Sequence, residues 1–358
     1  MKKVIISVTN DLSTDQRVDK ISNSLHNAGF SVLLVGRKFS NSPELANRKY
    51  AIYRFNTFFQ KTFLFYMEYN IRLFFFLLLC KSDILLSNDL DTLCANFAVS
   101  KIRNKKLIYD SHELFTELPE LLGRPVRKFI WSCVESFCLR RLNSIYTVSP
   151  SIANYYKNKY GVDMFVIYNF PLTRRVEQKS NNSEKKTIIY QGAVNKDRGI
   201  NLMIEAMCYV NAKLYIVGEG DLLQDMRQYT HKLNLNNKIF FKGKVGFDEL
   251  FEITQEADLG LSFEADTCLS YRYSLPNKIF DYINAEVPIL VSDLPEFRRI
   301  IKCYKVGQIL KSRDVKSVAK QINSLLSTSK KDWSSELLKA KKAYSWSIQE
   351  NKIISFFK

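Results

Sequence analysis

Short apolar runs alternate with helical patterns along most of this chain, and that alternation limits the fold more than any other feature. Residues 3–9 have the composition of a buried strand, residues 18–28 repeat apolar side chains at helical spacing, and residues 30–35 form a second apolar run. A strand, a helix and a strand in this order make a βαβ unit, which builds a parallel sheet through a right-handed crossover. The sequence therefore predicts an α/β fold.

The alternation occurs in two series with a polar stretch between them. After the first βαβ unit, further strands are predicted at residues 83–89, 106–112, 144–150 and 165–170. The second series has six predicted strands: 187–190, 213–217, 238–241, 259–262, 287–291 and 306–310. A chain of 358 residues suits two domains. We predict one domain over 1–170, a linker over the polar residues 171–186 and a second domain over 187–340.

The charge balance is strongly basic. There are 53 Lys and Arg against 36 Asp and Glu, and the net charge of +17 favours an anionic partner such as a phosphorylated ligand, a lipid surface or nucleic acid. The basic residues lie in scattered pairs, without a basic tail or one recognition helix. We therefore predict no nucleic-acid partner.

The cysteines and histidines limit which metal sites and which cellular compartments are plausible. The seven cysteines form no CxxC pair, and most lie in apolar contexts, which favours buried, reduced thiols in a cytoplasmic protein (Cys80, Cys133, Cys138, Cys208). Three histidines argue against a zinc site. Residues 1–3 lead directly into the first strand without a cleavage site, so no signal peptide is predicted.

The most apolar segment, residues 55–80, has two interpretations. Glu68, Asn70 and Arg72 interrupt it, so its longest uncharged run is too short to span a bilayer. It is either a core helix of the first domain or a partly exposed helix that enters a membrane interface. A group of basic residues later in the same domain would complement an anionic membrane surface (Arg124, Arg127, Lys128, Arg140, Arg141).

Residues 271–296 contain a candidate phosphate site. Pro276, Asn277 and Lys278 precede apolar residues at helical spacing, and Asp281 is predicted to lie early in the first helical turn. Free N–H groups at a helix N-terminus and the Lys278 ammonium together suit a phosphate. The alternative is an ordinary loop and helix cap.

A second basic loop, residues 191–199 (QGAVNKDRG), lies between a predicted strand and a helix. Gly192 and Gly199 allow close approach of the backbone to a ligand, and Lys196 and Arg198 can neutralise it. Arg198 is the stronger candidate because its planar guanidinium can bind two phosphate oxygens. A plain strand–helix turn with solvated charges is the alternative. Gly218 follows the next strand, in a turn of either structural or ligand-binding role.

Ionisable side chains follow two strands of the first domain. Asp89 and Asp91 come after one strand, and Asp110, His112 and Glu113 after the next. Open α/β sheets bind ligands at the carboxyl ends of their strands. His112 is therefore the candidate catalytic histidine, with Asp110 or Glu113 to orient it, and a structural role is the alternative. The first loop lacks GxGxxG, which argues against a dinucleotide.

Several motifs resemble those of one enzyme family. SLPNKIFDY at 274–282 with VPILVSDLPE at 287–296 is similar to the donor-sugar signature of retaining glycosyltransferases with the GT-B fold, of the family 4 type. NDLDT and YDSHELFTELPEL resemble the acceptor-side motifs, and NDLSTDQRV the first loop, where Arg17 could meet phosphate or lie at a surface helix end. The resemblance implies two Rossmann-like domains with the ligand cleft between them, and a final helix, about 341–358, that returns to the first domain.

The resemblance also implies roles for single residues. Arg198 stands where the family has a phosphate-binding Lys, and Asp281 where it usually has Glu; Tyr273 and Ala193 replace a Glu and an Arg of the family pattern. The implied donor-binding residues are Arg198, Lys278, Asn277, Asp281, Gly192, Gly218, Tyr273 and Ser274. The implied catalytic residues are His112, Glu113 and Asp110, with His112 bonding the sugar or moving a proton.

The function implied is transfer of a hexose from a nucleotide-diphosphate sugar to a saccharide or lipid-linked acceptor, with retention, in surface polysaccharide or glycolipid assembly. We expect no metal and no cofactor, because cations and helix N-termini would take the leaving-group charge. The expected location is the cytoplasm or the inner face of the cell membrane. Two alternatives stay open: a sugar-nucleotide epimerase of the same fold and a non-catalytic membrane-associated scaffold.

Overall fold

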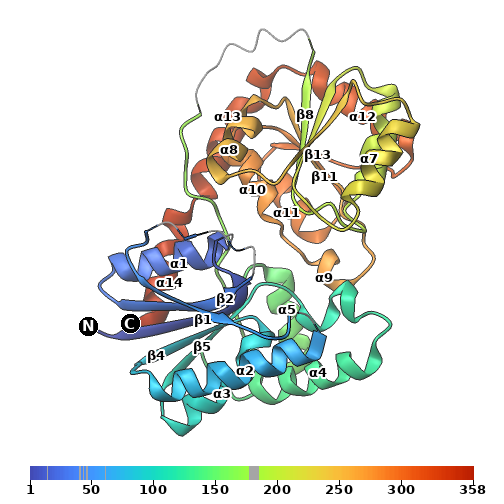
Figure 1. Cartoon of the computed structure of the whole chain (residues 1–358). Coiled ribbons are helices and arrows are strands. Elements are labelled where there is room, and N and C mark those ends of the chain that lie inside the picture. The colour runs from blue at the N-terminus through green and yellow to red at the C-terminus, as the bar shows by residue number, and fades with distance from the viewer. Residues whose placement is uncertain (14, 40–41, 43, 46, 61, 177–184) are drawn as a thin grey trace. The chain divides into compact units, whose positions relative to one another are not determined.

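A computed structural model describes residues 1–13, 15–39, 42, 44–45, 47–60, 62–176 and 185–358. The chain forms two compact units, each built around one sheet with helices against it (Figure 1). Unit 1 comprises Met1–Asn169 and Gln349–Lys358, and unit 2 comprises Phe170–Ile348. Of the predicted linker, residues 177–184 lie outside the described residues.

The sheet of unit 1 has seven strands in the order β3-β2-β1-β4-β5-β6-β7, and neighbouring strands pair in parallel. The central strands are apolar and buried on both faces, which is typical of parallel sheets covered by helices. The bounds are β1 Lys3–Asp11, β2 Ser31–Lys38, β3 Ala51–Asn56, β4 Ile84–Asn88, β5 Lys106–Ser111, β6 Ile145–Thr147 and β7 Phe165–Val166.

Helices α2, α3 and α4 pack in a row along unit 1, and α1 and α14 lie across the sheet from them (Figure 1). Phe357 of α14 is fully buried, with its ring centroid 6.2 Å from that of Phe30. The helices are α1 Gln16–Asn27, α2 Thr62–Leu79, α3 Leu90–Ile102, α4 Pro125–Leu139, α5 Pro150–Tyr160 and α14 Trp346–Phe357, with 3-10 turns η1 Phe115–Glu117 and η2 Pro119–Leu121.

Unit 2 repeats the architecture with six parallel strands in the order β10-β9-β8-β11-β12-β13. Its strands are β8 Thr187–Gln191, β9 Lys213–Val217, β10 Ile239–Gly243, β11 Leu259–Ser262, β12 Ile289–Val291 and β13 Gly307–Ile309. Its helices are α6 Ile200–Ala206, η3 Met207–Tyr209, α7 Leu223–Lys232, α8 Phe247–Glu256, α9 Leu269–Arg272, α10 Asn277–Asn284, α11 Pro295–Cys303, α12 Val315–Ser327 and α13 Lys330–Ala343.

The predicted fold class is confirmed: both sheets are parallel, and each predicted strand overlaps an observed one. One strand was not predicted. Residues 55–56, which we placed in the apolar helical segment, belong to the edge strand β3, and α2 begins only at Thr62. The prediction of buried cysteines is wrong for most of them, since Cys138 alone is buried and Cys94, Cys133, Cys208 and Cys303 are exposed.

Strand order reverses at β1 in unit 1 and at β8 in unit 2. In each sheet the connections on the two sides of this point run in opposite directions, which opens a crevice at the carboxyl ends of the strands. The loops after β1, β4 and β5 meet at this point in unit 1, and those after β8 and β11 in unit 2. The predicted site residues lie in or next to these loops, except Gly218, which follows β9.

Candidate functional site

The loop after β8 is shaped by two glycines. Gly192 has φ of +129°, and a Cβ there would lie 3.3 Å from Cε of Lys278. Gly218 has φ of +142°, and a Cβ there would lie 2.0 Å from the carbonyl oxygen of Gly192. The absence of a side chain at Gly218 thus lets the backbone of the Gly192 loop pack directly against it, and Gly192 leaves room for the ammonium group of Lys278.

Two predicted phosphate ligands converge in unit 2. Lys278, in the first turn of α10, is only 7% exposed, and its Nζ lies 2.8 Å from Oε1 of Glu264 and 4.1 Å from the ring centroid of Tyr190. Nη1 of Arg198 lies 3.7 Å from the same Oε1, and its guanidinium stands 4.7 Å from the ring centroid of Tyr271. Both cations therefore meet at one carboxylate oxygen.

Glu264 is fully buried directly after β11, and the sequence analysis did not select it. Ser262 Oγ donates to its Oε2 at 2.6 Å. Burial favours the neutral acid, but Lys278 and Arg198 outweigh it and lower the pKa of Glu264. Glu264 could have been predicted from its position after a predicted strand, because His112 was selected for the same reason.

Arg313 is a third cation that the sequence analysis missed. Its guanidinium donates to the carbonyl oxygens of Phe263 at 3.1 Å and Glu264 at 3.4 Å, and to Oγ of Ser292 at 3.2 Å. It holds the ends of β11 and β12 together at the edge where Glu264 lies. Arg313 is in a loop without a recognisable pattern, so no sequence signal identified it.

Asp281 lies in the second turn of α10, so the prediction that it sits in the first turn is wrong. Its Oδ2 accepts from Nε2 of Gln191 at 2.8 Å, and Gln191 Oε1 in turn accepts from Thr254. The helix begins one residue earlier than Lys278, at Asn277, and its N-cap residue is Pro276, which makes no side-chain cap hydrogen bond. Asp281 therefore connects α10 to the end of β8.

Tyr273 and Ser274 lie in the turn between α9 and α10. The backbone N–H of Tyr273 donates to the carbonyl of Leu269, and Oγ of Ser274 donates to the carbonyl of Tyr271 at 2.9 Å. These bonds fix the turn that leads into α10. The structure therefore brings Gly192, Arg198 and Lys278 together directly, and connects Asp281 and Gly218 to them through neighbours.

In unit 1, a chain of ion pairs crosses the carboxyl edge of the sheet. Arg17 donates from Nε and Nη2 to the two oxygens of Asp110, each at 2.9 Å. Asp110 Oδ2 lies 2.9 Å from Nε2 of His112, whose Nδ1 is 3.2 Å from Asp89 Oδ2. His112 is thus held between two carboxylates, and its backbone N–H also donates to Asp89.

This arrangement sets the charges. Burial disfavours an imidazolium, but Asp110 and Asp89 outweigh burial and raise the pKa of His112 well above its ordinary value. Burial likewise opposes ionisation of Asp110, yet Arg17 and His112 lower the pKa of that carboxyl to about 2. His112 is therefore a cation at neutral pH, with its ring N–H groups directed at carboxylates rather than poised as a base.

The structure bears on two pairs of alternatives that were left open for unit 1. Arg17 does not lie at a surface helix end, because it is buried and bonded to Asp110 across the sheet edge. The carboxylates that contact the His112 ring belong to Asp110 and Asp89. The carbonyl oxygen of Glu113, our other candidate, accepts from Ser111 Oγ and from the N–H of Phe115.

Asp91, at the start of α3, is a buried acid on the same edge. Thr9 Oγ1 donates to its carboxylate, and Asn70 of α2 donates to its backbone carbonyl at 2.7 Å. Burial and the neighbouring Asp89 raise the pKa of Asp91 to about 7. Asp89 itself has φ of 55°, a left-handed conformation that costs a non-glycine residue energy and is concentrated at functional sites.

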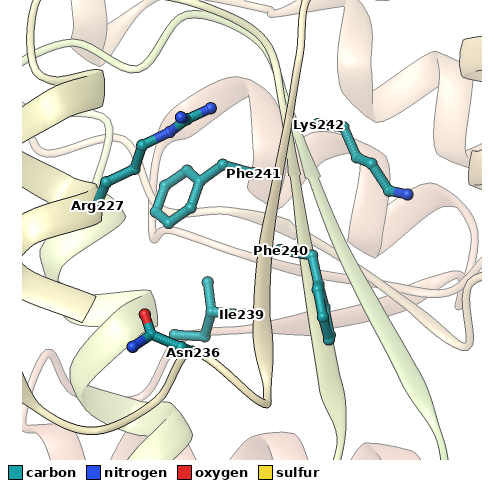
Figure 2. A pocket seen from close by; sticks show the side chains of 6 residues that line it. All are labelled: Arg227, Asn236, Ile239, Phe240, Phe241 and Lys242. Carbon is teal, nitrogen blue, oxygen red and sulfur yellow. The ribbon is translucent and has the colours of Figure 1, made fainter. Parts of the chain in front are cut away.

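A separate hollow of about 440 Å³ lies at the edge strand β10 (Figure 2). Its lining alternates along the strand, with Ile239 and Phe241 on one side and Phe240 and Lys242 on the other. The hollow thus wraps around the sheet edge and contains none of the predicted site residues. Among the described residues, no group of three or more His, Cys, Asp or Glu is placed to hold a metal ion.

We predict that Arg17→Met destabilises the protein by about 3–5 kcal/mol, because the buried carboxylate of Asp110 loses its bidentate partner. Urea denaturation at pH 7 measures the loss. The double variant Arg17→Met/Asp110→Asn should recover part of it, since no buried charge is then left unpaired. A loss below about 1 kcal/mol in the single variant would contradict the pairing.

We predict that Asp91→Asn stabilises the protein progressively as pH rises. With a pKa raised from 3.8 to about 7, Asp91 keeps its proton when folded while the unfolded chain releases it, so the wild type loses stability through this window. The advantage of the variant should grow by about 2 kcal/mol between pH 5 and pH 7. The exposed Glu120→Gln is the control, and a pH-independent difference for Asp91→Asn would refute the shift.

Comparison with known proteins follows the two units. A family model described as Glycosyltransferase Family 4 matches residues 15–171, and one described as Glycosyl transferases group 1 matches residues 173–339. The chain is 25% identical over 254 residues to chitobiosyldiphosphodolichol beta-mannosyltransferase of Candida albicans, covering 62% of this chain and 55% of that protein. It is 26% identical over 185 residues to an uncharacterized glycosyltransferase of Methanocaldococcus jannaschii, covering 47% and 45%. The chain thus spans about half the length of the curated relatives it matches.

Solved structures match over the full length. Sucrose-phosphate synthase of Thermosynechococcus elongatus superposes with a TM-score of 0.83 at 14% identity, covering 100% of this chain and 98% of that one. Anabaena HepE, solved in complex with UDP and glucose, superposes with a TM-score of 0.76 at 13% identity, covering 100% and 99%. These likenesses establish the fold, and the two family models together account for nearly the whole chain. The chain belongs to the GT-B glycosyltransferases of the family 4 type.

Proposed function

We propose that this protein transfers a hexose from a nucleoside-diphosphate sugar to a saccharide or lipid-linked acceptor, with retention of configuration, in surface polysaccharide or glycolipid assembly. The observation that carries the proposal is the convergence of Arg198 and Lys278 on one oxygen of buried Glu264. They lie beside the Gly192 loop and the N-terminus of α10. The family to which the chain belongs, and UDP and glucose bound to Anabaena HepE, support a donor of this class.

The geometry suits a leaving pyrophosphate. Breaking the bond between sugar and phosphate places negative charge on the departing diphosphate, and fixed cations stabilise it best when they need not reorganise. Glu264 holds both cations close together before a ligand arrives. Two cations against one carboxylate leave net positive charge for the diphosphate, and the N-terminus of α10 adds backbone N–H groups.

The unit 1 cluster has a different role. His112 is held as a cation between Asp89 and Asp110, so it can donate to an oxygen of the sugar or acceptor by exchanging one of these partners. Asp91, with its pKa near 7, is the carboxyl there best matched to receive a proton at neutral pH. We assign acceptor and sugar contacts to this cluster, and donor phosphate contacts to unit 2.

The proposal is tested by a donor screen. The protein is incubated with a panel of UDP- and GDP-sugars, binding is measured by calorimetry, and loss of the sugar is followed by mass spectrometry. A transferase should bind at least one donor and release the nucleotide diphosphate. An altered sugar nucleotide formed without an acceptor would indicate an epimerase instead, and no binding to any donor would indicate a non-catalytic scaffold.

We predict that Arg198→Ala and Lys278→Ala each lower turnover on the order of a hundredfold, measured with the donor that the screen identifies. Each variant removes one group that stabilises the negative charge of the leaving diphosphate. Lys196→Ala is the matched control, since Lys196 lies in the same loop but is exposed. Thermal melting checks the fold, particularly for Lys278→Ala, which leaves Glu264 with less compensation. Activity within a few-fold of wild type in both variants would refute the assignment.

We predict that His112→Ala impairs transfer and leaves UDP or GDP affinity nearly unchanged, because the proposed nucleotide contacts are all in unit 2. Calorimetry with the nucleotide and turnover with the chosen donor separate these effects. If nucleotide affinity and melting temperature fall together, His112 has a structural role instead.

A further inference from the structure

The outer surface of α2 is apolar along its length. A stripe of four side chains at every fourth position, from Phe65 to Leu77, packs into the core. The opposite stripe faces outward and consists of large apolar side chains: Leu64, Met67, Ile71, Phe75 and Leu79. Among the described residues, α2 is the one helix long and apolar enough to cross a bilayer by length and composition. Its buried stripe, however, belongs to the folded core of unit 1.

The apolar surface continues over two neighbouring helices. The rings of Tyr66 and Trp131 connect α2 to α4 at 5.5 Å, and those of Phe97 and Phe137 connect α3 to α4 at 5.7 Å. Figure 1 shows the three helices along the same side of unit 1. The exposed large apolar side chains of these two helices are Ile102 of α3 and Val126, Phe129, Ile130 and Phe137 of α4, and Lys101 is also exposed at the C-terminal end of α3. We call this surface, with the outer stripe of α2, the apolar face.

The acidic side chains of these helices avoid the apolar face. Within the three helices, all of whose residues are described, the acids are Glu68, Asp91 and Glu135. Glu68 pairs with Arg72 and accepts from the backbone N–H groups of Phe58 and Phe59. Asp91 is buried, and Glu135 is fully buried among hydroxyl groups, including that of Tyr156 at 2.9 Å.

Basic side chains instead flank the apolar face. Arg124 and Arg127 are exposed at the N-terminal end of α4, and Arg140 and Arg141 at its C-terminal end. The guanidinium of Arg141 lies 4.1 Å from the ring centroid of Phe137, so its stem follows the apolar surface while its charge stays outside. An apolar centre with cations at its margins matches an interface that is hydrocarbon within and anionic at the headgroups.

We infer that the apolar face of α2, α3 and α4 binds the surface of an anionic bilayer. The apolar side chains enter the headgroup–acyl boundary, and the four arginines meet lipid phosphates. A second copy of the chain is the less suitable occupant, because a two-fold contact would bring the arginine clusters of both copies together without a counter-charge. The inference does not depend on the proposed function, since it concerns binding rather than catalysis.

The test uses the full chain and co-sedimentation with vesicles. Wild type should bind phosphatidylglycerol-rich vesicles at low salt, and much less at high salt or with pure phosphatidylcholine. Ile71→Ser/Phe75→Ser/Phe129→Ser should lower binding at least tenfold. Leu338→Ser is the matched control, because Leu338 is also exposed but lies on α13 of unit 2, and its binding should equal that of wild type.

Two further variants keep the test decisive if the triple variant does not fold. Arg140→Gln/Arg141→Gln should lower binding to the anionic vesicles by about 25-fold, since each basic residue contributes about fivefold near such a surface. Phe129→Trp should show blue-shifted emission, above the wild-type background, that is quenched by brominated lipids. Absence of wild-type binding at low salt would overturn the inference. So would a folded triple variant that binds like wild type, or a wild-type dimer that becomes monomeric in the triple variant without any vesicle binding.

Discussion

A buried carboxylate remains ionised only where cations compensate for the lost water, and both candidate sites are organised around this constraint. Asp110 is the second-last residue of β5 in unit 1 and Glu264 follows β11 in unit 2, and neither is exposed. Each would cost several kcal/mol if left alone. Arg17 and His112 surround the first, and Lys278 and Arg198 the second. The positions of the functional cations thus follow from two acids at strand ends.

This arrangement has a chemical advantage. Long basic side chains on a surface lose conformational freedom when they bind a ligand. Here the carboxylate has already fixed them, so a diphosphate meets cations in place. Arg313 reinforces the edge by bonding the carbonyl oxygens of Phe263 and Glu264.

The sequence predicted the parts of the fold that depend on local pattern. Apolar runs identified the central strands, because these are buried on both faces. Strand β3 was missed because it is an edge strand in which only Phe55 is buried, and because it is followed by the more apolar α2. The exposed cysteines show a related limit: apolar neighbours in sequence do not place a side chain inside.

The sites were predicted less completely, because their contacts join residues distant in sequence. Arg17 and Asp110 are 93 positions apart, and no local pattern indicates that they pair. Lys278 and Arg198 were selected for their loops, but the partner that unites them, Glu264, could be found only by applying the strand-end rule to every strand. Asp281 was predicted to lie in the first turn because the helical pattern was taken to start after Lys278, whereas α10 already begins at Asn277.

The division of the chain has a consequence for the order of synthesis. Unit 2 is continuous, whereas unit 1 is completed by Gln349–Lys358, which includes the buried ring of Phe357. A ribosome makes this segment only after all of unit 2. The sheet of unit 1 is therefore synthesised first, but the helix α14 that covers it is synthesised last. Unit 2 can fold while unit 1 still lacks α14. During translation, the later part of the gene completes the earlier part of the protein.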